Sequence, residues 1–229
     1  MNIGGIQKLT LIDFPDKTAC TIFTTGCNYR CLYCHNKDLL EFGKNTQNVK
    51  NHKQAIDFLK SRAGLLEGVC ISGGEPLLQE NITEFIKEIK QLGFLVKIDT
   101  NGSNPKKLKE LIDNRYIDYV AMDIKNSPEN YAKTIGLTKY DIKPIEESLT
   151  ILRNSNIPYE LRTTVTKELH TLNDLIALAK WVSPVDKYFL QNYVDSDNVL
   201  QKGFTPFSYD EMNYFLTEIR KYLPNTEIR

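Results

Sequence analysis

Three cysteines within eight residues are the feature of this chain with the most evident chemistry. Cys27, Cys31 and Cys34 have the spacing C-x₃-C-x₂-C and follow the apolar run 19–23. Closed structural sites made of thiolates normally use four ligands, whereas a site that performs chemistry keeps one coordination position open. The triplet therefore predicts a [4Fe–4S] cluster that is held by three thiolates and has one iron free to bind a small molecule.

Two plainer interpretations of the cysteines are weaker. A structural zinc site would need His35 as its fourth ligand, but His35 is adjacent to Cys34 and the two would not easily reach one tetrahedral ion together. Disulfides are disfavoured because five cysteines are an odd number and the chain begins with no apolar leader. Cys20 and Cys70 lie in apolar runs, so we expect them in the core as small hydrophobic residues.

Length and composition narrow the class of protein. The 229 residues suit one domain, residues 1–229, with no linker-like or low-complexity stretch. Lysine plus arginine and aspartate plus glutamate both number 29, so the global charge indicates neither nucleic acid nor a membrane surface as a partner. The chain has no run of eighteen apolar residues, and reduced cysteines without a targeting segment indicate the cytoplasm.

The elements that must position the cysteines alternate between strands and helices. Six short runs rich in β-forming residues are expected to be strands: 18–24, 68–72, 94–99, 117–125, 159–165 and 187–193. Helical spacing of apolar residues follows most of these runs, with helix starts near Pro105, Thr171 and Ser208. Repeated β–α units imply a parallel sheet that is covered by helices.

The expected fold class is α/β, a partial, open (βα)₆ TIM-type barrel with a parallel sheet and the helices outside. Six units are too few for a full eight-stranded barrel, and a flat doubly wound sheet is the alternative. The barrel is favoured because polar groups lie at the C-terminal ends of all six strands, on the face that carries the chemistry of barrel enzymes. These groups are the cysteine loop and residues 73–75, 99–102, 123–125, 162–164 and 191–192.

With these motifs the chain resembles the radical S-adenosylmethionine (SAM) superfamily. The stretches that carry the resemblance are 25–36 around the cysteines, Ser-Gly-Gly-Glu-Pro at 72–76, Asp-Thr-Asn-Gly at 99–102 and Met-Asp-Ile-Lys at 122–125. Within the superfamily the chain is similar to the small enzymes that activate glycyl radical enzymes. The activating protein of anaerobic ribonucleoside-triphosphate reductase matches best, and pyruvate formate-lyase activating enzyme is a near relative. The resemblance covers residues 13 to about 193.

The resemblance implies that Cys27, Cys31 and Cys34 hold a [4Fe–4S] cluster whose fourth iron is chelated by SAM. Tyr33 is then expected near the adenine, and Glu75 is expected to accept a charge-assisted hydrogen bond from the methionyl ammonium. The full set of residues implied to bind the cofactor is Tyr33, His35, Gly73, Gly74, Glu75, Asp99, Thr100, Asn101, Asp123, Lys125, Arg162 and Gln191.

Two further roles come from the same resemblance. Asp99, Thr100 and Met122 match positions that coordinate a monovalent cation near the methionyl carboxylate in the formate-lyase activating enzyme. Lys125 matches a lysine that meets the carboxylate or the ribose of the cofactor. We do not expect any catalytic side chain beyond the cluster and the cofactor site.

Several of these residue types also have plainer roles. Tyr33 could be a loop aromatic at the barrel mouth, Glu75 an ordinary solvated carboxylate, and Lys125 a surface lysine at a strand end. Arg162 and Gln191 could serve only in hydrogen bonding between strand ends. These alternatives stay open on the sequence alone.

The resemblance also implies the reaction and the partners. A reduced cluster cleaves SAM to methionine and a 5′-deoxyadenosyl radical, which abstracts hydrogen from a glycine of a partner enzyme. Anaerobic ribonucleoside-triphosphate reductase is the expected partner, and a flavodoxin or ferredoxin is the expected electron donor. Pyruvate formate-lyase or another glycyl radical enzyme is the alternative. The formate-lyase branch carries a histidine near position 191, where this chain has Gln191-Asn192-Tyr193.

Two hypotheses from other classes remain. A radical SAM enzyme that acts on a small molecule, such as a deazapurine precursor, would have a sealed pocket. A non-catalytic metal-binding interaction protein would not cleave SAM under a strong reductant. The chain has no spare cysteines for an auxiliary cluster, which disfavours the larger peptide-modifying branches of the superfamily.

Overall fold

Eight strands form one sheet in which the strands lie in their sequence order. The computed structural model describes residues 1–41 and 51–229. β1 (Ile3–Thr10) pairs antiparallel with β2 (Ala19–Thr24), and all later pairs are parallel. The later strands are β3 (Gly68–Gly73), β4 (Leu95–Thr100), β5 (Tyr119–Asp123), β6 (Tyr159–Val165), β7 (Tyr188–Asn192) and β8 (Thr226–Ile228). Within the described residues β8 does not pair with β1, so the sheet does not close into a full barrel.

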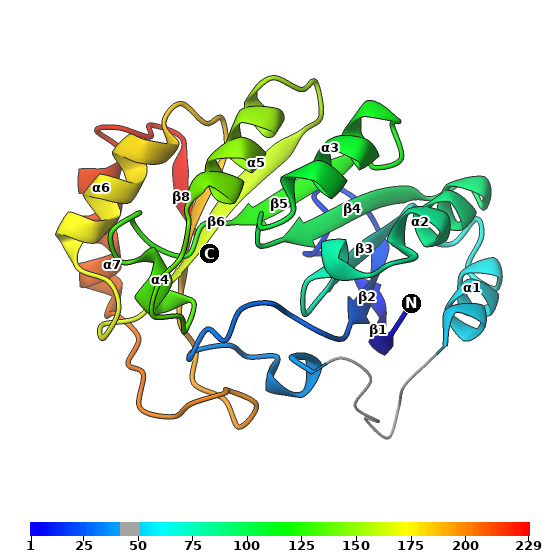
Figure 1. Ribbon diagram of the computed structural model, residues 1–229, viewed down its shortest axis with the longest axis horizontal. Helices are drawn as coiled ribbons and strands as arrows, with labels where there is room; N and C mark the ends of the chain where they lie inside the picture. The colour runs from blue at the N-terminus through cyan, green and yellow to red at the C-terminus, as the bar shows by residue number, and fades with distance from the viewer. Residues whose placement is uncertain (42–50) are drawn as a thin grey trace.

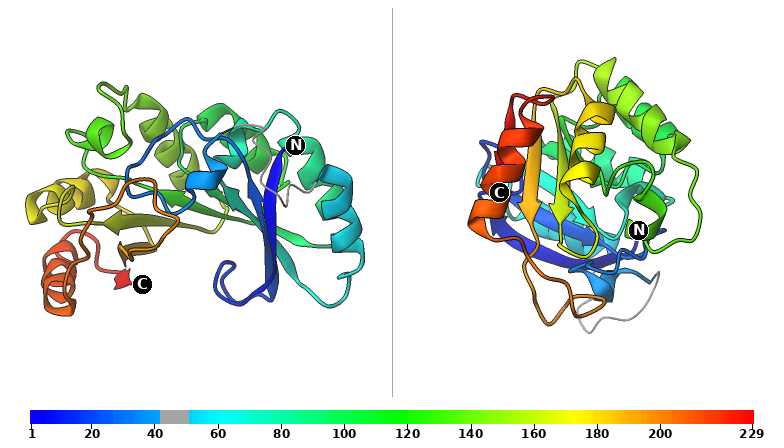
Figure 2. Two further views of the ribbon diagram at one scale, coloured as in Figure 1. Left: turned by 90° about the horizontal axis from the view of Figure 1, so that it is seen from below. Right: turned by 90° about the vertical axis from the view of Figure 1, so that its left-hand side faces the viewer.

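The helices lie along the outside of this curved sheet, and the segment after β2 lies on its open side (Figure 1). They are α1 (His52–Lys60), α2 (Ile82–Gln91), α3 (Pro105–Asp113), α4 (Tyr131–Thr134), α5 (Lys143–Arg153), α6 (Leu172–Val182) and α7 (Tyr209–Ile219). Two 3₁₀ turns, Lys37–Leu39 and Pro76–Leu78, follow β2 and β3. The views in Figure 2 show the same open, curved arrangement from two other sides.

Alternation along the strands separates an apolar face from a polar one. In β4, Val96 and Ile98 are fully buried in the main hydrophobic core, as are Phe85 and Ile89 of α2, which covers this part of the sheet. Lys97 and Asp99 leave the opposite, inner face, because successive side chains of a strand project to opposite sides. The inner face of the open barrel therefore carries charged groups below the strand ends.

The prediction of a partial, open α/β barrel is confirmed, and all six expected strands are present with small shifts at their ends. Two strands were not predicted. β1 is an edge strand that contains Gly4 and Gly5, which weaken a strand signal, and β8 is only three residues long. Cys20 and Cys70 are fully buried in the sheet, as expected. No helix in residues 1–41 and 51–229 is long and apolar enough to cross a membrane.

Candidate active site

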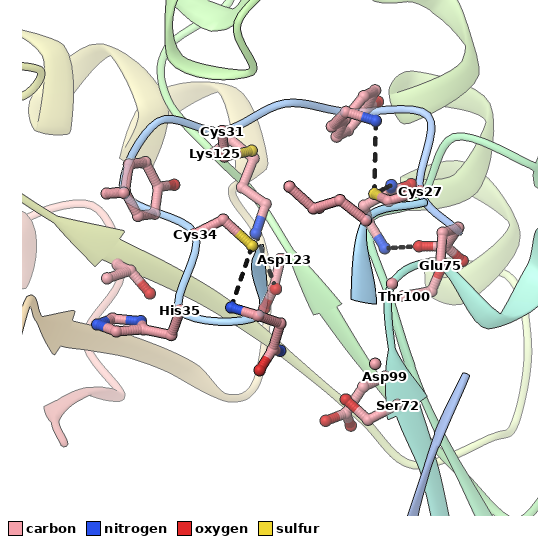
Figure 3. Close-up of a pocket in the computed structure, with 18 of the residues that line it drawn as sticks. Cys27, Cys31, Cys34, His35, Ser72, Glu75, Asp99, Thr100, Asp123 and Lys125 are labelled. Atoms are coloured by element: carbon pink, nitrogen blue, oxygen red, sulfur yellow. Dashed lines mark hydrogen bonds and ion pairs between the residues drawn. The ribbon is translucent and has the colours of Figure 1, made fainter. Parts of the chain in front are cut away.

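The polar groups predicted from the strand ends converge on one cavity of about 260 Å³. Figure 3 shows the three cysteines on the loop after β2, which lies over the strand ends that carry Glu75, Asp99 and Asp123. The predicted residues that line the cavity are Cys27, Cys31, Tyr33, Cys34, His35, Gly73, Gly74, Glu75, Asp99, Thr100, Asn101, Asp123, Lys125, Arg162 and Gln191. Met122 does not line it.

Backbone hydrogen bonds from distant segments hold the cysteine loop in place. The Arg30 amide donates to the carbonyl of Ile135, just after α4, at 2.9 Å. The Leu200 amide, in the segment after β7, donates to the carbonyl of Cys34 at 2.9 Å. The loop is therefore clamped from two sides by parts of the chain more than a hundred residues away, which gives an irregular segment a defined shape.

The glycine pair after β3 is required by the approach of the cysteine loop. Gly73 has a φ of +116°, and a Cβ on it would lie 2.4 Å from backbone atoms of Thr24. A Cβ on Gly74 would lie 2.2 Å from the carbonyl oxygen of Gly26. The next amide, that of Glu75, donates to the same Gly26 carbonyl at 2.8 Å. The glycines thus bring Glu75 against the start of the cysteine loop.

The three thiols have surroundings that suit metal ligands. The Tyr29 amide donates to Cys27 Sγ and the Asn36 amide donates to Cys34 Sγ, each at 3.4 Å. Such hydrogen bonds to sulfur stabilise thiolates and tune the potentials of iron–sulfur clusters. Burial raises the pKa of Cys27 to about 11 and that of Cys31 to about 12, so these two thiols are protonated at neutral pH when no metal is bound. Binding of a metal must therefore release protons.

His35 lines the cavity, but the contacts of its ring are with the segment after β7. Its Nε2–H donates to the carbonyl of Val194 at 2.6 Å, and its ring stacks on Tyr193 at 5.3 Å between centroids. Among the described residues no group of three or more His, Cys, Asp or Glu side chains is arranged to hold a single metal ion. His35 therefore connects the cysteine loop to the segment after β7.

Glu75 is not the solvated carboxylate that the sequence left open as an alternative, since it is 1% exposed. It accepts hydrogen bonds from Thr100 Oγ1 and the Asn101 amide, both at 2.7 Å, and from the Leu77 amide at 3.1 Å. No lysine, arginine or histidine of the described residues forms an ion pair with it. A buried carboxylate in a cavity without a cation of its own is suited to bind a ligand ammonium.

The pKa of Glu75 predicts a pH dependence of stability. Burial raises this pKa to about 7, against the opposing hydrogen bonds from Asn101, Thr100 and Leu77. A raised folded-state pKa means that the native state binds the proton more tightly than the unfolded chain does. The stabilisation is complete below about pH 4.5 and is lost as the pH rises through about 7.

We therefore expect the protein without cofactors to lose about 3 kcal/mol relative to Glu75→Gln between pH 5 and pH 8. Urea unfolding of both proteins at each pH measures this difference. Groups common to both, such as the buried His170 with its lowered pKa, cancel in the comparison. Parallel pH profiles of the two proteins would show that Glu75 does not titrate in this range.

Arg162 connects the two aspartates at the strand ends. Its Nε donates to Asp123 Oδ1 at 2.9 Å, and its Nη1 lies 3.4 Å from Asp99 Oδ2. Lys125 Nζ donates to Asp123 Oδ2 at 2.9 Å, so Lys125 is paired inside the site rather than extended at the surface. Burial raises the pKa of Asp123, but Arg162 and Lys125 outweigh this and hold it well below its usual range. Arg162 thus joins strand ends by hydrogen bonds, as its plainer role implied, and it also lines the cavity.

Tyr33 and Met122 lie in different environments. The Tyr33 side chain is buried, with the rings of His170 and Phe204 each 6.4 Å away, and its hydroxyl has no hydrogen-bond partner among the described residues. An unpaired buried hydroxyl beside the cavity suits a polar atom of a ligand. Met122 is fully buried and packs on Gly102, where an added Cβ would lie 2.1 Å from the Met122 Cε.

Other lining residues were not predicted as site residues: Tyr29, Asn36, Leu40, Ser72 and Thr164. Ser72 and Asn36 lie inside motifs quoted from the sequence, and Thr164 lies in the polar group 162–164 near the end of a predicted strand. Lys97 was also missed. It lies two residues before Asp99 in the same strand, and that spacing alone places both side chains on one face.

The site joins three thiols, an uncompensated buried carboxylate and a cationic network, and this set fits a [4Fe–4S] cluster together with SAM. Comparison with known proteins agrees with it. The family model described as the Radical SAM superfamily matches residues 21–182. A Methanocaldococcus jannaschii protein whose name assigns it to the glycyl-radical enzyme activating enzymes is 34% identical, over 99% of this chain and 95% of that protein.

Two further proteins extend the comparison. Pyruvate formate-lyase-activating enzyme of Clostridium pasteurianum is 29% identical, over 83% of this chain and 81% of that enzyme. A radical SAM methyltransferase of Sphaerobacter thermophilus has a similar fold, with a TM-score of 0.76 and 14% identity, over 96% of this chain and 68% of the other. The chain spans about half the length of some other solved structures that it matches.

The chain therefore belongs to the radical SAM superfamily. Within it, the chain is a member of the glycyl-radical enzyme activating enzymes, a family of enzymes that use a [4Fe–4S] cluster and SAM.

Proposed function

We propose that this protein activates anaerobic ribonucleoside-triphosphate reductase by removing a hydrogen atom from a glycine of that enzyme. The observation that carries the radical chemistry of this proposal is the contact of Gly74 and Glu75 with the start of the three-cysteine loop, which places a carboxylate without an ion-pair partner on the same cavity as the three thiols. When bound, the cluster and SAM supply a one-electron reductive cleavage that no side chain of the protein can perform.

The residues have separate parts in this proposal. Cys27, Cys31 and Cys34 hold the cluster and leave one iron for SAM. Glu75 accepts a hydrogen bond from the methionyl ammonium, and the Tyr33 hydroxyl, buried and unpaired, meets a polar atom near the adenine. The remaining cofactor contacts come from His35 on the cysteine loop and from the strand ends around the cavity: Gly73, Gly74, Asp99, Thr100, Asn101, Asp123, Lys125, Arg162 and Gln191.

The open sheet supports a protein substrate. Because β1 and β8 do not meet in the described residues, the inner side of the barrel is open for a glycine-bearing loop. Gln191 and Asn192 stand where the formate-lyase branch has a histidine, which favours the reductase as partner. We further propose that residues 1–229 act as one radical SAM domain in the cytoplasm, with a flavodoxin or ferredoxin as electron donor.

The partner is tested by electron paramagnetic resonance. The reduced protein with SAM is mixed, without oxygen, with the anaerobic ribonucleotide reductase subunit or with pyruvate formate-lyase from the same organism. We expect the doublet of a glycine-centred radical on the reductase and only slow turnover of SAM without a partner. A doublet on the formate-lyase alone would overturn the partner and keep the reaction. Acceleration of SAM cleavage by a small purine-like compound, with no doublet on either protein, would overturn the activating function.

A further inference from the structure

A buried lysine lies beneath the cavity. Lys97 precedes Asp99 by two residues in β4, so both side chains leave the inner face of the sheet. The Lys97 side chain is 1% exposed, and its Nζ donates to Asp99 Oδ1 and lies 3.9 Å from the Sγ of Cys70. Burial of an ammonium group is costly unless it is paired. The charge of Lys97 is therefore held at this place by Asp99.

With Lys97, every carboxylate oxygen of the two aspartates has a cationic partner from the chain itself. The oxygens of Asp99 face Lys97 and, at 3.4 Å, Arg162. The oxygens of Asp123 face Arg162 and Lys125, both at 2.9 Å. The five charges alternate across β4, β5 and β6, and three cations with two anions leave a net charge of +1. Asp99, Asp123, Lys125 and Arg162 line the cavity, so this net charge lies at its wall, with Lys97 beneath it.

The arrangement leaves no position for a monovalent cation at Asp99, because both oxygens of that carboxylate already have cations. The other two residues that matched such a site are also engaged elsewhere. Thr100 Oγ1 donates to Glu75 at 2.7 Å and accepts from the Gly102 amide at 3.1 Å. The side chain of Met122 is fully buried against Gly102. The side-chain oxygens of Asp99 and Thr100, the ones that could bind an alkali-metal ion, therefore already have partners and do not fit the cation that the resemblance implied.

We propose that Lys97 takes the place of a monovalent cation beside Asp99, so that SAM binding by this protein does not depend on alkali-metal ions. The part of Lys97 in SAM binding rests on the proposed function. Its replacement of a monovalent cation rests only on the ion pairs of Asp99 with Lys97 and Arg162. Burial lowers the pKa of Lys97, but Asp99 outweighs burial and keeps it above its ordinary value. The lysine is therefore a permanent cation at neutral pH, and Lys97 is a positioning residue for the carboxylates around the cofactor.

The test compares potassium chloride, sodium chloride and choline chloride at one ionic strength, about 0.15 M. Two quantities are measured on the full chain: the thermal unfolding midpoint without cofactors, and the affinity of the reconstituted protein for SAM. The wild-type protein should give the same midpoint and the same affinity in all three salts. Lys97→Ala leaves space for an ion, and in choline it should bind SAM roughly ten-fold more weakly.

Potassium or sodium should restore most of the SAM affinity of Lys97→Ala and most of the decrease in its unfolding midpoint. Lys97→Met removes the charge but fills the space, so it should respond to no salt. Lys90→Ala is the control for loss of an ion pair outside the cavity, because Lys90 pairs with Asp118 at 2.7 Å, and it should also show no rescue.

Three results would overturn the proposal. One is a wild-type protein that is stabilised by potassium over choline, and another is a Lys97→Ala protein that behaves alike in all salts. The third is equal rescue of Lys97→Ala and Lys90→Ala. If Lys97→Ala does not fold in any salt, the wild-type comparison decides alone. The unfolding midpoints need no SAM, so a failure of the proposed function would not be mistaken for a failure of this inference.

Discussion

Cys31→Ala is expected to abolish assembly of the cluster. Cys31 is buried between the other two cysteines of the loop, and two thiolates cannot hold a four-iron cluster with an open iron. After anaerobic reconstitution the wild-type protein should be brown and contain about four irons per chain, whereas the variant should be colourless with close to none. Iron analysis and visible absorption measure the difference.

Cys70→Ala is the matched control for this substitution. Cys70 is buried, like Cys31, but it lies in β3 and does not line the cavity. The variant should keep the full iron content and the visible spectrum. A colourless wild-type protein that carries one zinc, or equal iron loss in both variants, would contradict the assignment of the cluster to the loop.

Arg162→Met is expected to cause the largest loss of stability. Arg162 is the shared partner of two partly buried carboxylates, and its removal leaves Asp99 and Asp123 facing each other with one cation each. Breaking a buried ion pair on one side costs about 3–5 kcal/mol, because the remaining charge is left poorly compensated. Urea unfolding at pH 7 measures this loss.

The loss should depend on pH in a defined direction. The pKa of Asp123 and that of Asp99 are held below their usual range, so their contribution is present at neutral pH and is lost as the pH falls below about 4. The deficit of Arg162→Met should therefore shrink in acid. Lys90→Met, which breaks the more exposed pair with Asp118, should cost about 1 kcal/mol or less at pH 7. Similar losses in the two variants would show that the network adds little.

Much of the fold could be predicted from the sequence, because each parallel strand is a short apolar run followed by a helical pattern. The strand that ends at Asp99 shows both what could be predicted and what could not. Its end beside the Asp-Thr-Asn-Gly motif predicted a polar group at the rim. Lys97 was overlooked because a lysine within an apolar run has no motif. Its spacing from Asp99 places both side chains on one face of the strand, but only the folded barrel shows that this face is buried.

The roles of Gly73, Gly74 and Glu75 show the same limit. The sequence placed the two glycines and the anionic Glu75 at the cofactor, and a glycine, which lacks a Cβ, permits a close backbone approach. The structure adds that the group approached is the carbonyl of Gly26 and that Glu75 is buried without a cation. Contacts between segments that are far apart in the sequence, such as that of Cys34 with Leu200, leave no local pattern, so they could not have been predicted.

The most direct test of the proposed activity is the transfer of deuterium from a partner glycine to the nucleoside product. A glycyl radical enzyme from the same organism, produced with α-deuterated glycine, is incubated with the reconstituted protein, SAM and a strong reductant. We expect 5′-deoxyadenosine that contains one deuterium, in proportion to the glycine radical formed. Two results would contradict the activity proposed for this protein. One is 5′-deoxyadenosine that contains no deuterium with every glycyl radical enzyme of the organism, and the other is SAM that stays uncleaved.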